Sequence, residues 1–247
     1  MKKFKIAAAQ SISVSGSVQE NIERHQRLIV LAAENSVQCI IFPELSLTGY
    51  EPDLADTLAF TADDKRIDSL REDSEKYKML IIAGAPYRAK TGLYIGAFAL
   101  FPDRSFSVYS KRFLHPGEEK YFSPGNTNYT FTLEQEKLSV AICADISNPL
   151  HADDASQAGS TIYAAGVLIT ATGYETDATI LRGYAKKYSM LVLMANHGGA
   201  SGGYNSAGRS ALWSPTGSLL AEYDGTGEGL VVAEKENGMW IGKTIIQ

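Results

Sequence analysis

The sequence predicts an α/β protein in which peripheral helices cover sheets of mixed strand direction. Three observations lead to this class. Short apolar runs of strand length alternate with helical segments early in the chain and again in its second half. Two pairs of apolar runs in the middle are joined by connections too short to hold a helix, so their strands must be antiparallel. The tail returns to short strands separated by turns.

The first third of the chain contains helices between apolar strands. We expect a strand at 5–9, a helix at 17–36, a buried strand at 38–42, a polar helix at 63–77 and a strand at 79–83. The helix at 17–36 has apolar residues on one stripe, and Ser17 and Glu20 have the spacing of a capping box. Pro43 closes the strand at 38–42.

The middle of the chain is predicted to be mostly β-structure. A hairpin-like connection, Pro102-Asp103-Arg104, joins the strands at 93–101 and 105–110, and a charged turn joins those at 128–133 and 137–143. Helix and strand then alternate again. We expect helices at 154–163 and 176–188, and strands at 167–170, 190–195, 210–214, 218–223 and 229–234.

Length and composition restrict the classes of protein to which this chain can belong. It has 247 residues, of which 45% are apolar and 21% are charged, as in globular proteins and unlike disordered chains. The 23 basic and 28 acidic side chains give a net charge of −5, without the basic excess of a general nucleic-acid binder. No repeat, low-complexity tract or linker divides the sequence, which predicts a single domain over residues 1–247.

Cysteine content and hydropathy indicate the compartment. The chain has two cysteines, Cys39 and Cys143. A secreted scaffold of this length usually has more, so we expect reduced thiols and a cytoplasmic protein. No apolar run approaches the roughly 18 residues needed to cross a bilayer, and we expect no membrane partner.

Three reactive residues stand where apolar strands end. Glu44 follows the strand at 38–42, Lys111 follows the strand at 105–110, and Cys143 ends the strand at 137–143. Side chains just beyond strand ends often do the chemistry of α/β proteins. A carboxylate can take the proton of a thiol nucleophile, and an ammonium can stabilise the charge that develops on an attacked carbonyl or nitrile. Taken singly, such a glutamate or lysine is more often a solvated surface residue, and such a cysteine is usually a small buried hydrophobe.

The sequence around these residues resembles the nitrilase superfamily, also called carbon-nitrogen hydrolases. The similarity lies in Phe-Pro-Glu-Leu-Ser-Leu-Thr-Gly-Tyr at 42–50, Ser-Lys-Arg-Phe-Leu at 110–114 with Tyr-Phe-Ser-Pro-Gly at 121–125, and Ala-Ile-Cys-Ala-Asp at 141–145. The order Glu, Lys, Cys also agrees, as do the tail segments 194–196, 208–210 and 214–217. The resemblance extends over about residues 5–234.

The resemblance implies a fold and a chemistry. It implies a four-layer α-β-β-α sandwich that pairs into a homodimer. Cys143 would be the nucleophile, Glu44 the general base and Lys111 the stabiliser of the tetrahedral oxyanion. The expected reaction is hydrolysis of a small-molecule amide through a Cys143 thioester, with no metal or organic cofactor.

The resemblance also implies supporting roles for further residues. The N–H of Ala144 would be a second oxyanion donor. The second glutamate of the family, which orients the substrate amide and Lys111, falls on Glu118, or on Glu119 if the loop is displaced by one residue. Loop position further places Tyr50 in the pocket wall, together with Asn148, Ala171 and Thr172.

Two departures from the family pattern affect the expected substrate and dimer. Lys187 and Tyr188 stand where many members have Glu-Asn, after Gly183 in the same helix, and the run after Asp145 differs from the common Asp-x-Arg-Phe-Pro-Glu. The residues that follow the nucleophile, Ala144-Asp145, are closer to the amidase branches than to true nitrilases, so an amide is favoured over a nitrile.

Several alternatives remain at this level. A Cys–His hydrolase would use His115, His151 or His197 with Cys143. His151-Ala-Asp-Asp suggests a metal site or, more simply, an exposed helix start capped by Asp153 or Asp154. The glycine-rich segment 198–203 precedes a strand rather than a helix, which favours a mobile loop near the pocket mouth over a dinucleotide site. Nitrile hydrolysis, acyl transfer to an amine, and a non-catalytic ligand-binding member of the fold are the other functions considered.

Overall fold

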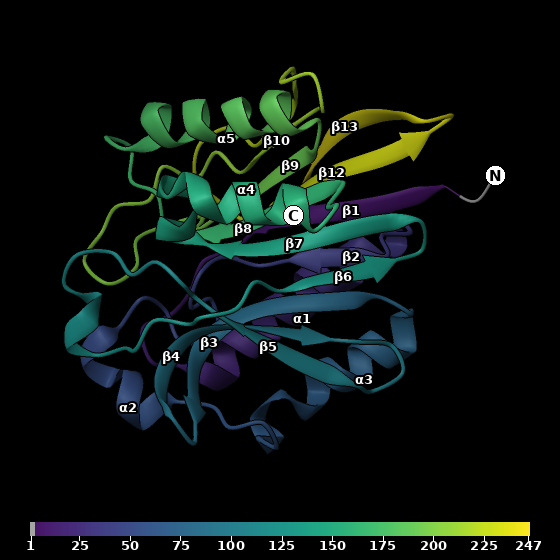
Figure 1. Cartoon of the computed structure of the whole chain (residues 1–247). Helices are drawn as coiled ribbons and strands as arrows, with labels where there is room; N and C mark the ends of the chain where they lie inside the picture. The colour runs from purple at the N-terminus through teal and green to yellow at the C-terminus, as the bar shows by residue number, and fades with distance from the viewer. Residues whose placement is uncertain (1–2) are drawn as a thin grey trace.

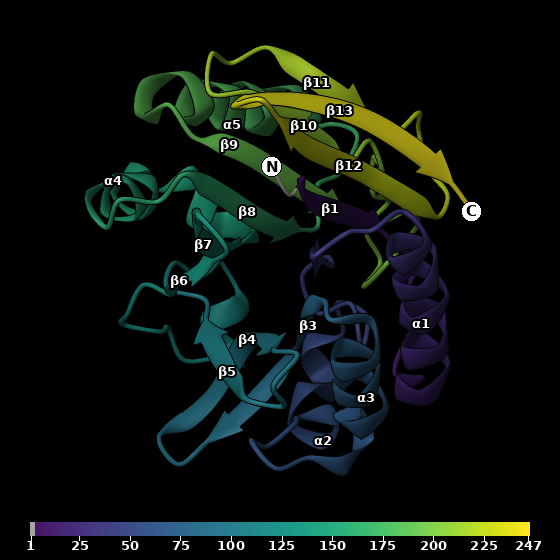
Figure 2. The ribbon, with the colours of Figure 1, turned by 90° about the vertical axis from the view of Figure 1, so that its right-hand side faces the viewer.

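Two β-sheets pack face to face, and helices cover both outer surfaces (Figure 1). The computed structural model describes residues 3–247, so Met1 and Lys2 of the expected domain lie outside the described residues. One sheet has the strand order β13-β12-β1-β2-β3-β4-β5 and the other β11-β10-β9-β8-β7-β6. Helices α4 and α5 cover one side of the sandwich, and α1 and α3 cover the other (Figures 1 and 2). The expected four-layer α-β-β-α sandwich is confirmed.

The elements have the following bounds. The strands are β1 (Phe4–Gln10), β2 (Cys39–Ile41), β3 (Leu80–Ala89), β4 (Gly92–Leu100), β5 (Phe106–Ser110), β6 (Thr130–Leu133), β7 (Glu136–Ile142), β8 (Ile162–Val167), β9 (Leu191–Asn196), β10 (Ala211–Trp213), β11 (Leu219–Glu222), β12 (Gly229–Glu236) and β13 (Met239–Ile246). The α-helices are α1 (Val18–Glu34), α2 (Ala55–Leu58), α3 (Asp68–Tyr77), α4 (Pro149–Gln157) and α5 (Tyr174–Tyr188). Short 3₁₀ turns are η1 (Pro52–Leu54), η2 (Lys65–Ile67), η3 (Glu118–Lys120) and η4 (Cys143–Ser147).

The period-two alternation of the strands explains the layers. In β1, Ile6 and Ala8 pack in the core between the two sheets, whereas Ala7 and Ala9 pack in the core under α1 and α3. In β7, Val140 likewise faces the opposite sheet while Ala141 faces α4 and α5. Because successive side chains point to opposite faces, strands covered on both faces must be apolar throughout.

Parallel strands at the centre of each sheet bring two of the predicted reactive residues together. β1, β2 and β3 are parallel, as are β7, β8 and β9. Antiparallel pairs such as β3 with β4 and β4 with β5 extend one sheet to its edge. β2 is the central strand of its sheet and packs against β8, whereas β7 lies beside β8 in the other sheet. Glu44 follows β2 and Cys143 follows β7.

Most expected elements lie within two residues of the observed bounds, and β3 extends to Ala89 because it pairs along the whole of β4. The capping box of α1 was a wrong prediction: the Ser17 side chain makes no capping hydrogen bond. The Asn21 side chain holds this end instead. It accepts from the N–H of Val14 at 2.7 Å and donates to the carbonyl of Leu47 at 3.1 Å, which ties α1 to the loop after Glu44.

The helix expected at 154–163 was also wrong, and so was the strand expected at 167–170, because β8 already ends at Val167. Helix α4 is Pro149–Gln157, and residues 162 and 163 already belong to β8. Asn148 caps α4 by accepting from the N–H of Leu150 at 3.1 Å, and Pro149 occupies the first turn, where its missing N–H costs nothing. Asp153 and Asp154 therefore lie inside the helix and do not cap it.

Strand β13 was not predicted. It pairs with β12 through a turn in which Asn237 and Gly238 have φ values of 51° and 81°. Asn-Gly is the strongest short hairpin signal, since both residues tolerate positive φ, so this strand was detectable in the sequence. In residues 3–247 no helix is long and apolar enough to cross a membrane.

Candidate active site

Glu44 follows β2 directly, and its backbone lies so close to two glycines of the neighbouring strands that no side chain would fit at those two positions. A Cβ on Gly84 of β3 would lie 2.5 Å from the carbonyl oxygen of Pro43, and one on Gly166 of β8 would lie 2.5 Å from that of Phe42. The backbone that carries Glu44 therefore packs closely between the two sheets, and the Glu44 side chain is fully buried.

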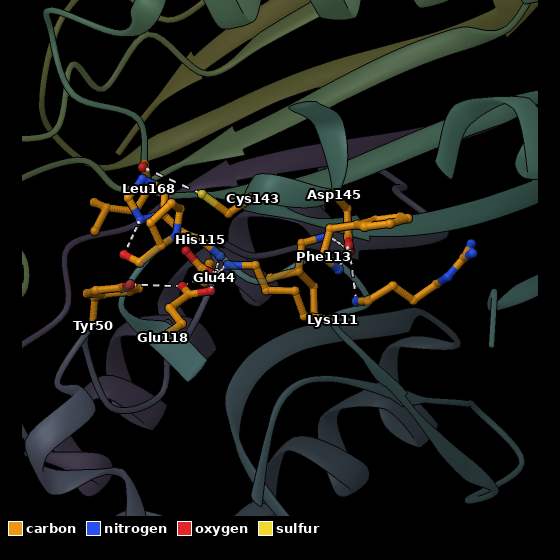
Figure 3. A network of polar contacts seen from close by, with 12 residues as sticks. Glu44, Tyr50, Lys111, Phe113, His115, Glu118, Cys143, Asp145 and Leu168 are labelled. Carbon is orange, nitrogen blue, oxygen red and sulfur yellow. Dashed lines mark hydrogen bonds and ion pairs between the residues drawn. The ribbon is translucent and has the colours of Figure 1, made fainter. Parts of the chain in front are cut away.

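Lys111 follows β5 and is fully buried. Its Nζ donates to Glu44 Oε1 at 2.7 Å and to Glu118 Oε1 at 2.8 Å (Figure 3). The backbone N–H of Gly125 donates to the carbonyl of Lys111 at 2.7 Å, and a side chain at Gly125 would meet the carbonyl of Ser110. Close backbone packing thus positions the lysine as it does Glu44.

Of the two candidates for the second glutamate, Glu118 and Glu119, it is Glu118, at the start of η3, that contacts Lys111. Its Oε1 also accepts from the Tyr50 hydroxyl at 2.8 Å, and its Oε2 accepts from the N–H of His115 at 2.7 Å. Glu119 is exposed, and its carboxylate accepts from the N–H of Gly117 instead.

Cys143 begins η4 with a φ of 41°, a rare conformation for a residue other than glycine. Such strain is found at functional sites, where the surrounding structure holds it. The residue is half-buried, and its sulfur lies 3.8 Å from the carbonyl oxygen of Leu168. Figure 3 shows the thiol facing the Glu44–Lys111–Glu118 group from the opposite sheet.

Asp145 is a residue whose role the sequence reasoning missed. Its buried carboxylate accepts from the N–H of Ile142 at 2.9 Å and from the Tyr109 hydroxyl at 2.6 Å. It also accepts from the N–H groups of Arg112 at 3.1 Å and Phe113 at 2.9 Å. One carboxylate therefore joins the turn that carries the thiol to the loop that follows Lys111. An acidic residue directly after a strand-end nucleophile was the available signal.

The electrostatics of the group differ from those of free side chains. Burial raises the pKa of Glu44 to about 7 against the opposing effect of Lys111. Burial alone would lower the pKa of Lys111, but Glu44 and Glu118 outweigh it and raise that pKa. Burial and the charge of Glu44 raise the pKa of the Cys143 thiol well above its usual value. The lysine is thus charged, and the thiol needs a base to ionise.

The three histidines considered as partners of Cys143 do not hydrogen-bond to it. The Nε2 of buried His197 donates to the backbone carbonyl of Glu44 at 2.7 Å, and burial lowers its pKa to about 4. His151 is buried between the hydroxyls of Tyr109, at 2.9 Å, and Tyr163, at 2.8 Å, so it does not open an exposed helix or face a metal site. Among residues 3–247 no histidine hydrogen-bonds to Cys143, which disfavours the Cys–His alternative.

A cavity of about 320 Å³ opens beside the thiol. Of the residues predicted for its wall, Tyr50 and Ala144 line it, whereas Asn148, Ala171 and Thr172 do not. Ala171 and Thr172 are exposed, because the chain turns outward after residue 170, and Asn148 caps α4 beside a neighbouring hollow. The remaining wall comes from His115, Ile146, Ser147, Leu168, Ile169, Thr170, Gly173, Asp177 and Tyr204.

The glycine-rich segment 198–203 packs more closely than a surface loop. A side chain at Gly202 would meet the carbonyl oxygen of Tyr50, and one at Gly198 would meet that of Gly227. Ser201 Oγ accepts from the N–H of Tyr50 at 2.8 Å. The segment thereby supports Tyr50 in the cavity wall.

Curated relatives share part or most of the chain. A glutamine-dependent NAD(+) synthetase of Acinetobacter baylyi is 31% identical over 59% of this chain and 28% of its own length. A nitrilase of Pyrococcus abyssi is 25% identical over 87% of this chain and 83% of its own length. The chain spans only 28 to 39% of the three NAD(+) synthetases first matched.

Solved structures share the fold. A CN-hydrolase superfamily protein of Xanthomonas campestris superposes with a TM-score of 0.88 at 18% identity, covering 96% of this chain and 92% of that one. A mutant amidase of Nesterenkonia sp. AN1 in complex with butyramide gives a TM-score of 0.85 at 22% identity, covering 95% and 92%.

A family model also matches nearly the whole chain. The model described as carbon-nitrogen hydrolase matches residues 5–240. This range includes all three motifs on which the resemblance was based, and Cys143 stands at the position expected of the nucleophile. The chain therefore belongs to the carbon-nitrogen hydrolase family of the nitrilase superfamily.

Proposed function

We propose that the chain hydrolyses a small-molecule amide to a carboxylate and ammonia or an amine, through a thioester on Cys143. One observation supports this above all: Lys111 lies between Glu44 and Glu118 at hydrogen-bonding distance, beside a thiol that faces a cavity. The arrangement supplies a base, a cation and a nucleophile within one buried group.

In the first half-reaction, the Cys143 sulfur attacks the amide carbon while Glu44 takes the thiol proton. The oxyanion is stabilised by the Lys111 ammonium and by the backbone N–H of Ala144. The C–N bond then breaks as Glu44 passes its proton to the leaving nitrogen. Ammonia or an amine departs, and the acyl group remains on sulfur as a thioester.

In the second half-reaction, Glu44 takes a proton from water, and the resulting hydroxide attacks the thioester carbon. The C–S bond breaks, the carboxylic acid leaves, and the proton returns to the Cys143 sulfur. Glu118 has no part in these transfers. Its hydrogen bonds to Lys111 and to the Tyr50 hydroxyl fit a role in holding the lysine and the substrate amide.

The test is ammonia release from a panel of small carboxamides, ω-amides, N-carbamoyl amino acids and nitriles. We expect the chain to hydrolyse at least one carboxamide faster than the matching nitrile. Cys143→Ala should lower kcat by at least about a thousandfold, whereas Cys39→Ala, which removes the other and fully buried thiol, should retain turnover. Full activity in Cys143→Ala would contradict the proposal. Faster turnover of the nitrile than of the matching carboxamide would make nitriles the substrate class.

Alkylation followed by mass spectrometry tests the non-catalytic alternative. Cys143 lines the cavity and has Glu44 as a base, whereas Cys39 is buried and burial raises its pKa. An electrophile should therefore label Cys143 selectively in the wild type and more slowly in Glu44→Gln. Equal labelling of both thiols, or of neither, would instead support a ligand-binding member of the fold.

Acyl transfer, dimerisation and location extend the proposal. Added hydroxylamine competes with water for the thioester, so the ratio of hydroxamate to acid distinguishes an acyltransferase from a hydrolase. We also propose a homodimer in the cytoplasm, where the free thiols Cys39 and Cys143 stay reduced. A monomeric mass by sedimentation equilibrium would overturn the dimer.

A further inference from the structure

The cavity beside Cys143 is lined by acidic side chains and, among the described residues, by no arginine or lysine. Glu44, Glu118 and Asp177 contribute carboxyl groups to its wall. Glu44 and Glu118 share the ammonium of Lys111 behind them. Among the described residues, no arginine or lysine lines the cavity, and no basic group pairs with Asp177. One carboxyl group thus stands in the cavity wall without a counter-charge.

Asp177 lies in the first turn of α5, and its side chain is directed toward the space beside Gly173. A Cβ on Gly173 would lie 3.7 Å from Asp177 Oδ2 and 3.7 Å from Thr170 Oγ1. Both oxygens therefore border the same small volume, and all three residues line the cavity. Glu175, in the same helical turn, behaves differently: it is exposed and pairs with Arg209 at 2.9 Å outside the cavity.

This arrangement discriminates between substrates by their charge. A substrate carboxylate in the cavity would meet further carboxylates and no arginine, so a like-charge contact would disfavour it. An ammonium or guanidinium would find a carboxylate acceptor, the Thr170 hydroxyl, and the rings of Tyr50 and Tyr204, which pack edge to face at 5.8 Å.

We propose that the enzyme prefers amides that carry a positively charged amino or guanidino group, and that Asp177 binds this group. The inference rests on the proposed amide hydrolysis at Cys143. Asp177 is a substrate-binding residue in this scheme, and the bond-making steps at Glu44, Lys111 and Cys143 are the same for every substrate. Asp177 therefore acts through the affinity for the cation, and its effect should be found mainly in KM.

Three amides of equal chain length test the preference: pentanamide, 5-aminopentanamide and glutaric acid monoamide. We expect kcat/KM to fall in the order cationic, neutral, anionic. The cationic amide should exceed the neutral one by about tenfold, the effect of one hydrogen bond to a charged group. A wild-type enzyme that treats the cationic and neutral amides alike, or that prefers the anionic one, would overturn the inference.

Variants assign the preference to Asp177. Asp177→Asn keeps the shape and removes the charge, so the ratio of cationic to neutral kcat/KM should fall about tenfold, mainly through KM. Glu175→Gln removes the same charge from the same helical turn outside the cavity and should leave the ratio at the wild-type value. Alanine can adopt the φ of −88° found at Gly173. Gly173→Ala places a methyl group between Asp177 and Thr170, so it should also lower the ratio of cationic to neutral kcat/KM.

The failure of this inference is distinguishable from the failure of the proposed function. Ammonia release from pentanamide that disappears in Cys143→Ala reports on the hydrolysis alone, whatever the preference. If none of the three amides is hydrolysed, calorimetric titration of Cys143→Ala with each amide measures the binding preference directly. Equal affinity for cationic and neutral amides, or an equal loss of all activities in Asp177→Asn and Glu175→Gln, would overturn the role of Asp177.

Discussion

At the scale of single residues, the protonation state of Glu44 sets the conditions for the reaction. A fully exposed glutamate is ionised at neutral pH, and a general base with a low pKa is a weak one. Burial raises the pKa of Glu44 to about 7, while Lys111 at 2.7 Å limits the rise. The carboxylate is therefore basic enough to take a thiol proton and is still largely available at physiological pH.

The pH dependence of kcat/KM follows from this value. The carboxylate form is active, so the rate should rise with pH, about tenfold per unit below pH 7, and become level above it. Lys111, whose pKa is raised, stays charged over this range. Initial rates with a neutral amide from pH 5 to 9 measure the profile. An acid limb centred near the ordinary glutamate value of about 4.3 would contradict the assignment of Glu44 as the base.

The neighbouring histidine contributes at the same scale without entering the reaction. His197 donates to the carbonyl of Glu44 and is held neutral by burial. It therefore positions the backbone of the base, which explains why a histidine close to the site is not a member of a Cys–His pair.

At the scale of elements, glycines set how closely the catalytic segments approach the strands beside them. Gly84 in β3 and Gly166 in β8 touch the backbone on either side of Glu44, and Gly125 touches the segment before Lys111. None of these three has a positive φ, so glycine is required there for space and not for backbone conformation. The same strands thus form the core and fix the distance between the base and the cation.

Gly166→Ala tests this control. Its Cβ would lie 2.5 Å from the carbonyl oxygen of Phe42, so β2 and Glu44 must shift. We expect a loss of about 1–3 kcal/mol in the free energy of unfolding and a fall in kcat of at least about tenfold. Chemical denaturation and steady-state rates measure the two effects.

Gly183→Ala is the matched control. Gly183 lies inside α5, is exposed, and has no atom near the position of an added Cβ. Alanine should raise the free energy of unfolding by about 0.5–1 kcal/mol and leave kcat at the wild-type value. If both variants behaved alike, close approach would not be the reason for glycine at 166.

At the scale of the whole molecule, three apolar cores hold four layers together: one between the sheets and one beneath each helical layer. Several polar side chains buried in this architecture make hydrogen bonds. His25 is an example, with Nδ1 2.7 Å from the carbonyl of Asn21, Nε2 2.9 Å from the Ser46 hydroxyl, and its ring stacked on Phe42 at 3.9 Å.

Buried histidines make the stability of the molecule sensitive to acid. Burial lowers the pKa of His25 to about 3 and that of His197 to about 4. Below about pH 6.5 these histidines bind protons in the unfolded chain but stay neutral in the folded protein. The free energy of unfolding therefore decreases as the pH decreases. Glu44 acts in the opposite direction between about pH 7 and its ordinary value, because its folded form binds a proton first.

Burial also lowers the pKa of His151, so three histidines act against one glutamate and a net loss is predicted. The free energy of unfolding should fall by at least about 1.4 kcal/mol per pH unit between about pH 6 and pH 5. Urea denaturation at several pH values measures the slope, and His25→Gln should reduce it. Stability that stays level or increases toward pH 5 would show that these histidines are not held neutral in the folded protein.

The sequence by itself determined the α/β class, most strand positions and the three reactive residues, because strand periodicity and strand-end motifs are local properties. Helix α4 and strand β13 were misread although Asn148-Pro149 and Asn237-Gly238 were local signals. Tertiary structure alone decided the rest. The contact of Glu118 with Lys111, the link through Asp145, the glycine clamps and the placement of Asp177 in the cavity join segments far apart in the chain. Such contacts depend on how the two sheets and their loops meet, which no local pattern encodes.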